Sequence, residues 1–241
     1  MKVICYGDSN TYGYDPRGWL GGRYGADDRW VDILAKRTGW EILNWGLNGR
    51  EILPQSTTFP ADTDLLMVML GTNDLLQGCT PSGTAQRMLR FLAVLTVEHD
   101  KILLIAPPPV AFGAWVQEQR LIDASAELAV QYQALAERLG VRFADAGAWG
   151  VGLAYDGVHF TEQGHRAFAE EIWKELIVSP SISENTSPNT PCGWPSPRSP
   201  TPAGSARGDR TAGQRQGTFN FSSSGAAGPA RGTPGGKHSC G

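Results

Sequence analysis

Residues 65–74 are Leu-Leu-Met-Val-Met-Leu-Gly-Thr-Asn-Asp, and the fold class follows from this segment. Its first six residues are all apolar, which is the pattern of a strand covered on both faces by other elements. The last four residues have the composition of a turn. A second strand of the same kind is predicted at 102–106, Ile-Leu-Leu-Ile-Ala. Such strands are typical of parallel sheets with helices on both sides.

Outward from this segment, the chain alternates short apolar runs with helical repeats. The remaining predicted strands lie at 3–6, 41–44 and 141–143. Apolar residues recur at helical spacing in four segments, around 30–34, 88–95, 121–139 and 168–176. This order predicts an α/β fold, a three-layer αβα sandwich around a five-stranded parallel sheet. On such a sheet the loops after the strands gather along one edge, where open α/β proteins build their sites.

Composition divides the 241 residues into a folded part and a tail. Between Ser179 and Gly241, glycine, proline and serine make up 31 of 63 residues, and no apolar run there could offset the entropy of ordering the segment. We therefore predict one folded domain at 1–178 and a disordered Pro/Gly/Ser-rich tail at 179–241. A chain that ends near Val178 should keep its activity.

Charge and hydropathy exclude several classes of protein. The net charge is −3, with −7 on residues 1–178 and +4 on the tail, so the folded part has no polycationic surface for nucleic acid. No apolar stretch reaches the ~20 residues that span a membrane. The N-terminus enters a strand pattern at once, without a signal-peptide layout, and the four cysteines form no CxxC pair. We expect a cytoplasmic protein without disulfides and without a nucleic-acid or membrane partner.

Four polar segments fall at the carboxyl ends of predicted strands or just before the last helix. They are Gly7-Asp8-Ser9-Asn10-Thr11, Asn44 to Arg50, Gly71 to Asp74, and Asp156-Gly157-Val158-His159. Each alone has an ordinary structural interpretation as a turn, an aspartate N-cap or a surface loop with a solvated histidine. Because the fold can bring all four to one edge of the sheet, a single arrangement can account for them together.

That arrangement is a serine hydrolase. A serine hydroxyl attacks an ester only when a base takes its proton, and His159 can do this for Ser9. Asp156, three residues before the histidine, can reach back to the second ring nitrogen and fix the tautomer. The backbone N–H groups of Ser9 and Gly49 and the side-chain amide of Asn73 are available to bind the oxyanion.

These blocks resemble the SGNH (GDSL-type) hydrolase family. Gly7-Asp8-Ser9 matches the first block of the family, Gly49 the second, Gly71-x-Asn73-Asp74 the third and Asp156-x-x-His159 the fifth. The resemblance covers residues 3–178. It implies a flavodoxin-like fold, a triad of Ser9, His159 and Asp156, an oxyanion hole of Ser9, Gly49 and Asn73, and no metal or cofactor.

Two positions depart from the family pattern or leave it ambiguous. Asn10 stands where the family usually has leucine, a change that we do not expect to disable attack by the serine. In the second block Gly46 competes with Gly49, although the spacing from Asn44 favours Gly49.

Three further segments resemble the arylesterase and acyltransferase branch of the family. They are Asp28-Arg29-Trp30, Ala106 to Pro109, and Asp156 to Glu162. Some members of that branch transfer acyl groups to alcohols or peroxide, and some form compact oligomers. The resemblance therefore implies acyl transfer and a homo-oligomer as further expectations.

Residues near the nucleophile are expected to bind the substrate, namely Asp8, Asn10, Tyr12 and Trp19. Together with Tyr14, the two aromatic residues of this set would form an apolar mouth suited to short acyl chains and to aryl or alkyl leaving groups. The alternative is that one or two of these rings pack against the first helix or a neighbouring subunit.

Other titratable residues are given structural roles. His165 is expected to be exposed or to lie just behind the reacting groups, Glu162 to be a first-turn helix charge and His99 to be solvated. No cluster of histidine, cysteine and carboxylate residues has the spacing of metal ligands.

The sequence thus predicts a serine esterase that acts on small short-chain acyl esters. Two alternatives stay open. One is a carbohydrate O-acetylesterase that uses the same triad, with Trp19 and Trp115 stacking on a sugar. The other is a non-catalytic, flavodoxin-like binding module.

Overall fold

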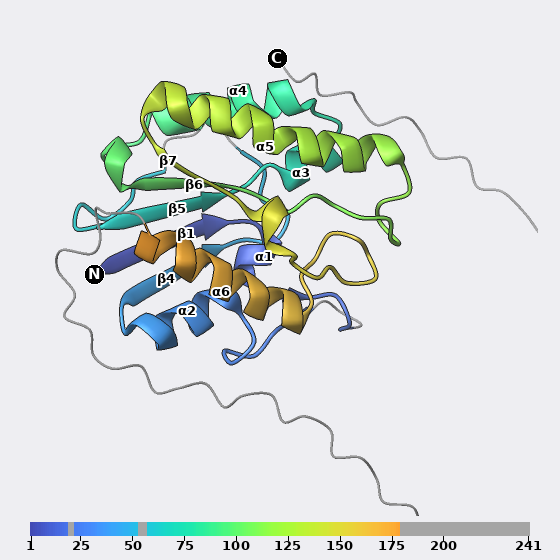
Figure 1. Cartoon of the computed structure of the whole chain (residues 1–241), viewed down its shortest axis with the longest axis horizontal. Helices are drawn as coiled ribbons and strands as arrows, with labels where there is room; N and C mark the ends of the chain where they lie inside the picture. The colour runs from blue at the N-terminus through green and yellow to red at the C-terminus, as the bar shows by residue number, and fades with distance from the viewer. Residues whose placement is uncertain (19–21, 53–56, 179–241) are drawn as a thin grey trace, which may run out of the picture. The chain divides into compact units, whose positions relative to one another are not determined.

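The computed structural model describes residues 1–18, 22–52 and 57–178 (Figure 1). Trp19 and the predicted tail at 179–241 lie outside the described residues, and the predicted boundary at 178 stays a prediction. The five predicted strands are all present, as β1 (Lys2–Gly7), β4 (Glu41–Gly46), β5 (Leu65–Met69), β6 (Ile102–Ala106) and β7 (Arg142–Asp145). A short antiparallel pair, β2 (Tyr14–Asp15) and β3 (Gly22–Arg23), was not predicted.

The five predicted strands form one sheet in the order β4-β1-β5-β6-β7. Every neighbouring pair in it is parallel, with Val3 of β1 opposite Leu65 of β5 and Cys5 opposite Asn44 of β4. This is the doubly wound order, in which the chain runs to one side of β1 and then to the other. The α/β prediction is therefore confirmed. The carboxyl ends of β1, β4 and β5 lie side by side at the point where the strand order reverses.

The four helical repeats also form helices as predicted. They are α2 (Trp30–Thr38), α4 (Pro81–Ala93), α5 (Gln119–Leu139) and α6 (Glu162–Val178). The other helical elements of the described residues are two single-turn helices, α1 (Ser9–Tyr12) and α3 (Thr72–Leu76), and two 3₁₀ turns, η1 (His99–Lys101) and η2 (Ala146–Trp149). These short elements were not predicted, because a single turn contains too few residues to display a period.

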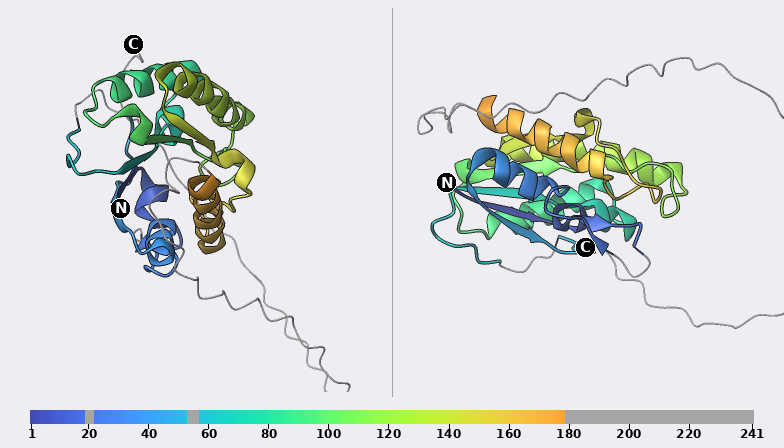
Figure 2. Two further views of the ribbon diagram at one scale, coloured as in Figure 1. Left: turned by 60° about the vertical axis from the view of Figure 1, so that its left-hand side comes forward. Right: turned by 90° about the horizontal axis from the view of Figure 1, so that it is seen from below.

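Helices cover the sheet on both faces, with α4 and α5 on one side and α2 and α6 on the other (Figures 1 and 2). The fully buried strand β5 separates two hydrophobic cores. Leu66 and Val68 belong to the core under α4 and α5, whereas Leu65, Met67 and Met69 belong to the core under α2 and α6. Side chains alternate across a strand, so one apolar run supplies both cores.

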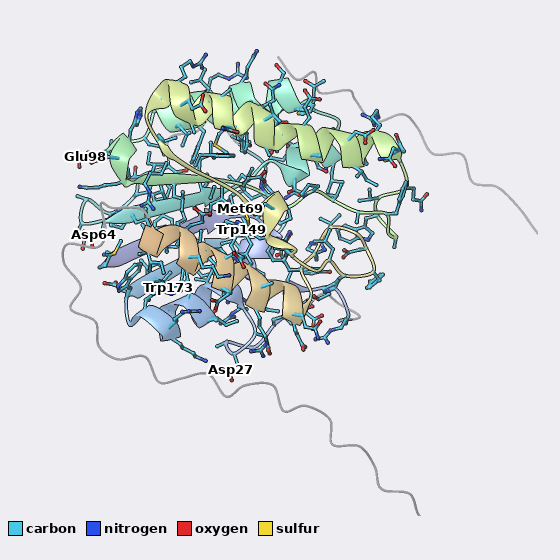
Figure 3. All side chains as sticks on the ribbon, in the orientation of Figure 1. Asp27, Asp64, Met69, Glu98, Trp149 and Trp173 are labelled. Carbon is cyan, nitrogen blue, oxygen red and sulfur yellow. The ribbon has the colours of Figure 1, made fainter. Side chains whose placement is uncertain are left out.

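Aromatic side chains fill the second core towards α6. Trp149 of η2 lies on Phe168, with ring centroids 4.9 Å apart, and Trp173 lies 6.2 Å from Trp40. Figure 3 labels Met69, Trp149 and Trp173, which come from three separate segments of the chain. This packing fixes α6 against the sheet, and with it the loop that precedes α6.

Two sequence expectations concern membrane-spanning helices and disulfide bonds. In the described part of the chain no helix is both long and apolar enough to pass through a membrane. Cys5 is a buried free thiol. The expectation of a chain without disulfides stays a prediction.

Candidate active site

The turn between β1 and α1 presents Ser9 at the carboxyl edge of the sheet. Gly7 ends the strand, and a Cβ there would lie 2.1 Å from the Thr11 Oγ1 atom, so only glycine allows this approach. Asp8 is the N-cap of α1, and its Oδ1 accepts the Asn10 N–H at 2.9 Å. The cap fixes the backbone on both sides of Ser9, whose own N–H is at the start of the helix.

Ser9, His159 and Asp156 form one chain of hydrogen bonds. The Ser9 hydroxyl lies 2.9 Å from the His159 Nε2 atom, and the His159 Nδ1–H donates to Asp156 Oδ2 at 2.7 Å. All three residues are buried, with exposed fractions of 6%, 3% and 0% respectively. The carboxylate accepts hydrogen bonds only, so the proton sits on Nδ1 and Nε2 is free to accept the serine proton.

The turn that carries Asp156 is built to hold this carboxylate ionised. Its Oδ1 atom accepts the N–H groups of Val158 and His159, each at 2.9 Å. Burial by itself would raise the pKa of the Asp156 carboxyl, but the bonds from the His159 ring and from the two N–H groups outweigh it and hold the pKa below its ordinary value. Gly157 adopts φ +81°, and a Cβ there would lie 2.0 Å from the Ala111 carbonyl oxygen.

Asn10 connects the serine turn to the histidine loop. Its Nδ2 donates to the Val158 carbonyl at 3.1 Å, and its Oδ1 accepts the Phe160 N–H at 2.9 Å. The side chain is buried and makes these contacts on both sides of His159. The departure from leucine at this position therefore supports the site geometry. A role for Asn10 in binding substrate stays a prediction.

Asp8 lies deeper than a residue at the mouth of a site. Its exposed fraction is 2%. Burial raises the pKa of its carboxyl to about 6, although the Asn10 N–H and the nearby His159 and Arg50 oppose the increase. Its contact with substrate stays a prediction.

The three predicted oxyanion donors come from three loops at this edge. Gly49 has φ +72°, and a Cβ added there would meet nothing within 4 Å, so its backbone borders open space. At Gly46, in contrast, a Cβ would lie 2.0 Å from the Tyr12 nitrogen, which makes it a packing glycine. Asn73 is in the first turn of α3, and its Nδ2 donates one hydrogen to the Arg50 carbonyl at 3.1 Å. Its second amide hydrogen can bind an oxyanion.

Arg50 holds these loops together. Its Nη1 donates to the Gly7 carbonyl at 2.9 Å and also to the Trp45 carbonyl. The guanidinium lies 4.1 Å from the centroid of the Tyr6 ring, and the side chain is half-buried. Burial lowers the pKa of Arg50, but guanidinium groups stay charged. The arginine thus connects the end of β1 to the loop that follows β4.

A partly buried ion pair supports the same loop. Asp74 has an exposed fraction of 0% and lies 2.9 Å from the Arg87 guanidinium of α4. Its carboxylate also accepts the Ile52 N–H at 3.2 Å. Burial raises the pKa of Asp74 despite its partner. Loss of Arg87 would be costly, because it leaves the buried charge of Asp74 without its ion-pair partner.

The aromatic residues predicted near the nucleophile have different surroundings in the structure. Tyr14 lies beside the reacting imidazole, with its ring centroid 4.5 Å from that of His159. Tyr12 instead packs under the Arg23 guanidinium, 4.3 Å from its ring. Trp115 contacts the same imidazole edge-on, at 5.1 Å and 83°. Trp19 lies outside the described residues.

His165 is buried. Of the two positions expected from the sequence, exposure on the surface is therefore wrong. Its exposed fraction is 0%, and its ring lies 5.2 Å from Tyr24 and 5.3 Å from Phe160. The Trp30 N–H points at Nδ1 over 3.5 Å, and Nε2 has no partner among the described residues. Burial, with help from nearby Arg29 and His159, lowers the pKa of His165 to about 3. The ring is therefore neutral at physiological pH.

The remaining assignments concern the surface and metals. Glu162 is the first residue of α6, as expected of a first-turn charge, and pairs with Arg17 at 2.7 Å. His99 is exposed, and its Nδ1–H donates to the Leu139 carbonyl at 2.8 Å. Within residues 1–18, 22–52 and 57–178, no three histidine, cysteine or carboxylate side chains gather as metal ligands would.

Sequence reasoning missed the residues that support the site. Arg50 and Asn10 hold it through backbone carbonyls and N–H groups, and such contacts leave no pattern in a sequence. Arg87 was missed because it lies on a helix that had only been assigned a packing role. The sequence indicated Trp115 as a platform for sugar but not its edge-on contact with His159. The apolar run from Pro107 to Val116, which contains one tryptophan, was the available signal for a binding loop.

Comparison with known proteins identifies relatives over most of the chain. A family model, described as the GDSL-like Lipase/Acylhydrolase family, matches residues 5–167. A curated protein from Bos taurus, "Isoamyl acetate-hydrolyzing esterase 1 homolog", is 24% identical over 209 residues, which cover 71% of this chain and 80% of that protein.

Solved structures give the same result. The native aryl esterase of M. smegmatis is 28% identical with a TM-score of 0.60, and the match covers 72% of this chain and 98% of that one. A carbohydrate acetylesterase family member from Sinorhizobium meliloti is 28% identical with a TM-score of 0.63, over 74% of this chain and 98% of that one. Both similarities extend over nearly the full length of the known protein.

Proposed function

The chain belongs to the GDSL-like lipase/acylhydrolase family and is a carboxylic ester hydrolase, and we propose that it cleaves short-chain acyl esters with Ser9 as nucleophile, His159 as base and Asp156 as its partner. The observation that supports this proposal best is the chain of hydrogen bonds of 2.9 and 2.7 Å through these three buried side chains. Residues 1–178 would be the catalytic domain.

In the first half of the reaction, Ser9 Oγ attacks the ester carbonyl carbon while His159 Nε2 takes its proton. The imidazolium that forms is stabilised by Asp156, which also holds the ring in the orientation that faces the serine. The same Nε2–H then protonates the leaving-group oxygen as its bond to the acyl carbon breaks. An alcohol departs, and an acyl-enzyme on Ser9 remains.

The negative charge on the carbonyl oxygen needs fixed donors while Ser9 attacks. We assign this role to the backbone N–H groups of Ser9 and Gly49 and to the free amide hydrogen of Asn73. Arg50 and the Asp74–Arg87 pair hold the loops of these donors before substrate binds, so little reorganisation is needed in the transition state. Loss of one oxyanion donor typically lowers turnover about 100- to 1000-fold.

In the second half of the reaction, His159 activates water, which attacks the acyl carbon and releases the acid. An alcohol that occupies the place of water would instead take the acyl group, so acyl transfer belongs to the same proposal. The preference for short acyl groups draws on relatives, since their names refer to isoamyl acetate and to acetyl groups on carbohydrate.

A carbohydrate O-acetylesterase is the second candidate. It is favoured by the similarity to the Sinorhizobium meliloti protein and by Trp115, which has an exposed fraction of 55% next to His159 and could stack on a sugar ring. Initial rates on p-nitrophenyl acetate and on acetylated xylan, measured side by side, decide between the two candidates. The binding-module alternative is set aside by the family to which the chain belongs.

Labelling by a sulfonyl fluoride tests the proposed nucleophile directly. We expect stoichiometric modification of Ser9 in the native protein, located by peptide mass spectrometry, together with loss of esterase activity. Ser9→Ala should abolish the label, and His159→Ala should slow it strongly, because the hydroxyl then lacks its base. Labelling of another serine with full loss of activity would refute the assignment.

A cytoplasmic location and a homo-oligomer also stay predictions.

A further inference from the structure

Two aromatic rings from separate loops contact the imidazole of His159. Tyr14 comes from β2, and Trp115 comes from the loop between β6 and α5. Trp115 keeps an exposed fraction of 55%. An exposed apolar surface next to reacting groups is typical of a binding site.

The backbone of the tryptophan loop is fixed to the turn that carries the histidine. The Trp115 N–H donates to the Asp156 carbonyl at 3.1 Å, and the Ala111 N–H donates to the Gly157 carbonyl at 2.9 Å. In Figure 1 the green loop before α5 and the yellow loop before α6 can be followed to this contact. Main-chain groups make these bonds, so the position of the loop does not depend on the indole ring.

The chemistry of the proposed reaction places the leaving group beside these rings. His159 Nε2 must come within about 2.6–3.2 Å of the leaving oxygen to protonate it. The carbonyl oxygen points elsewhere, to the oxyanion donors. The carbon group attached to the leaving oxygen therefore extends from the imidazole, where Tyr14 and Trp115 lie. The alcohol acceptor of an acyl transfer enters at the same place, because that step is the reverse of leaving-group departure.

We propose that Tyr14 and Trp115 form a subsite that selects esters by their leaving alcohol and favours flat, apolar alcohols, such as benzyl alcohol. This rests on the proposed esterase function of Ser9 and His159. The loop sequence favours an apolar ring over a sugar, since residues 107–116 contain no polar side-chain group except the indole N–H. A sugar, in contrast, presents hydroxyl groups that need hydrogen-bond partners.

Acetates that differ only in the alcohol isolate the subsite, because all of them give the same acetyl-enzyme. We would measure kcat/KM for benzyl acetate and for ethyl acetate in the full-length protein and in Trp115→Ala and Tyr14→Ala. The ratio of the two values should fall about five- to tenfold in each variant, as expected for loss of one aromatic contact. Phe112→Ala is the matched control, since it removes an exposed ring of the same loop, and its ratio should stay unchanged.

Acyl transfer provides an independent measurement of the same subsite. In the presence of both acceptors, acetyl-enzyme should partition between benzyl alcohol and ethanol in a ratio that falls to a similar extent in Trp115→Ala. Equal losses on both acetates with an unchanged partition would overturn the proposal and leave Trp115 as a support for the imidazole. A selective loss on acetylated xylose instead of benzyl acetate would overturn the apolar class. Absence of turnover on every acetate in the native protein would refute the esterase proposal itself.

Discussion

The side-chain amide of Asn73 donates a hydrogen bond to the backbone carbonyl of Arg50 at 3.1 Å. The guanidinium of Arg50 in turn reaches the Gly7 carbonyl, two residues before the proposed nucleophile, at 2.9 Å. One residue thus connects the loops that carry Ser9, Gly49 and Asn73.

Asn73→Ala should lower kcat about 100- to 1000-fold and change KM little, because the amide acts mainly on the charge that forms in the transition state. Steady-state kinetics on p-nitrophenyl acetate measure both values. Gln77→Ala, at the exposed end of the same short helix, is the control and should keep native kinetics. An increase in KM with native kcat would show that Asn73 binds substrate without acting on the oxyanion.

Arg50→Met should lower kcat because it removes the bonds to the Gly7 and Trp45 carbonyls while it keeps much of the side-chain volume. Unfolding in urea should also show a loss of about 1.5–3 kcal/mol, the usual contribution of a hydrogen bond to a charged group. Arg50→Lys retains one donor group and should recover part of kcat. Native kcat in a stable Met variant would contradict the positioning role.

Ser9→Ala and His159→Ala should each lower kcat by several orders of magnitude, and Asp156→Ala should cost less. Because the triad acts as a unit, the Ser9→Ala/His159→Ala double variant should be little worse than either single variant. Rates are best compared at equal fractions of folded protein, verified by circular dichroism. Multiplicative losses in the double variant would mean that the two side chains act separately.

His165 should make the native protein less stable in acid. Its pKa is about 3 in the folded state, below the ordinary value of 6.5, so the unfolded chain binds more protons between these two pH values. Stability from this residue is therefore complete above pH 6.5 and is lost as the pH falls towards 3.

His165→Gln keeps an acceptor for the Trp30 N–H but cannot titrate in this range. Between pH 7 and pH 5 the variant should lose less stability in urea than the native protein, by on the order of 1–2 kcal/mol. His99→Gln, which changes an exposed histidine, should follow the native pH dependence. Parallel pH profiles for native protein and His165→Gln would disprove the linkage.

A chain that ends at Val178 should fold and keep native kcat/KM on p-nitrophenyl acetate. The buried members of the hydrophobic cores described here run from Val3 to Leu176, and the proposed site lies between Ser9 and His159. Esterase assays and thermal unfolding of the shortened chain provide the check. A folded product with most of its turnover lost would assign a functional role to residues 179–241.

The sequence alone was sufficient for the fold class, and it also suggested the proposed triad and oxyanion donors. The run at 65–70 is apolar on every residue, and this pattern is typical of a strand buried on both faces. Ser9, Asn73 and His159 were found because hydrolytic chemistry restricts the residue types that can act and because these residues follow strands or precede the last helix. Local patterns encode such information, since they depend on residue type and spacing within one segment.

Only the tertiary structure decided what holds these residues in place. Asn10 and Arg50 act through backbone groups of segments up to 150 positions away, and the burial of His165 depends on rings from Tyr24 and Phe160. The structure also distinguishes the two candidate glycines of the second block. Gly46 is packed against Tyr12, whereas Gly49 borders open space. Contacts between distant segments exist only after the chain has folded, so no periodicity or spacing in the sequence records them.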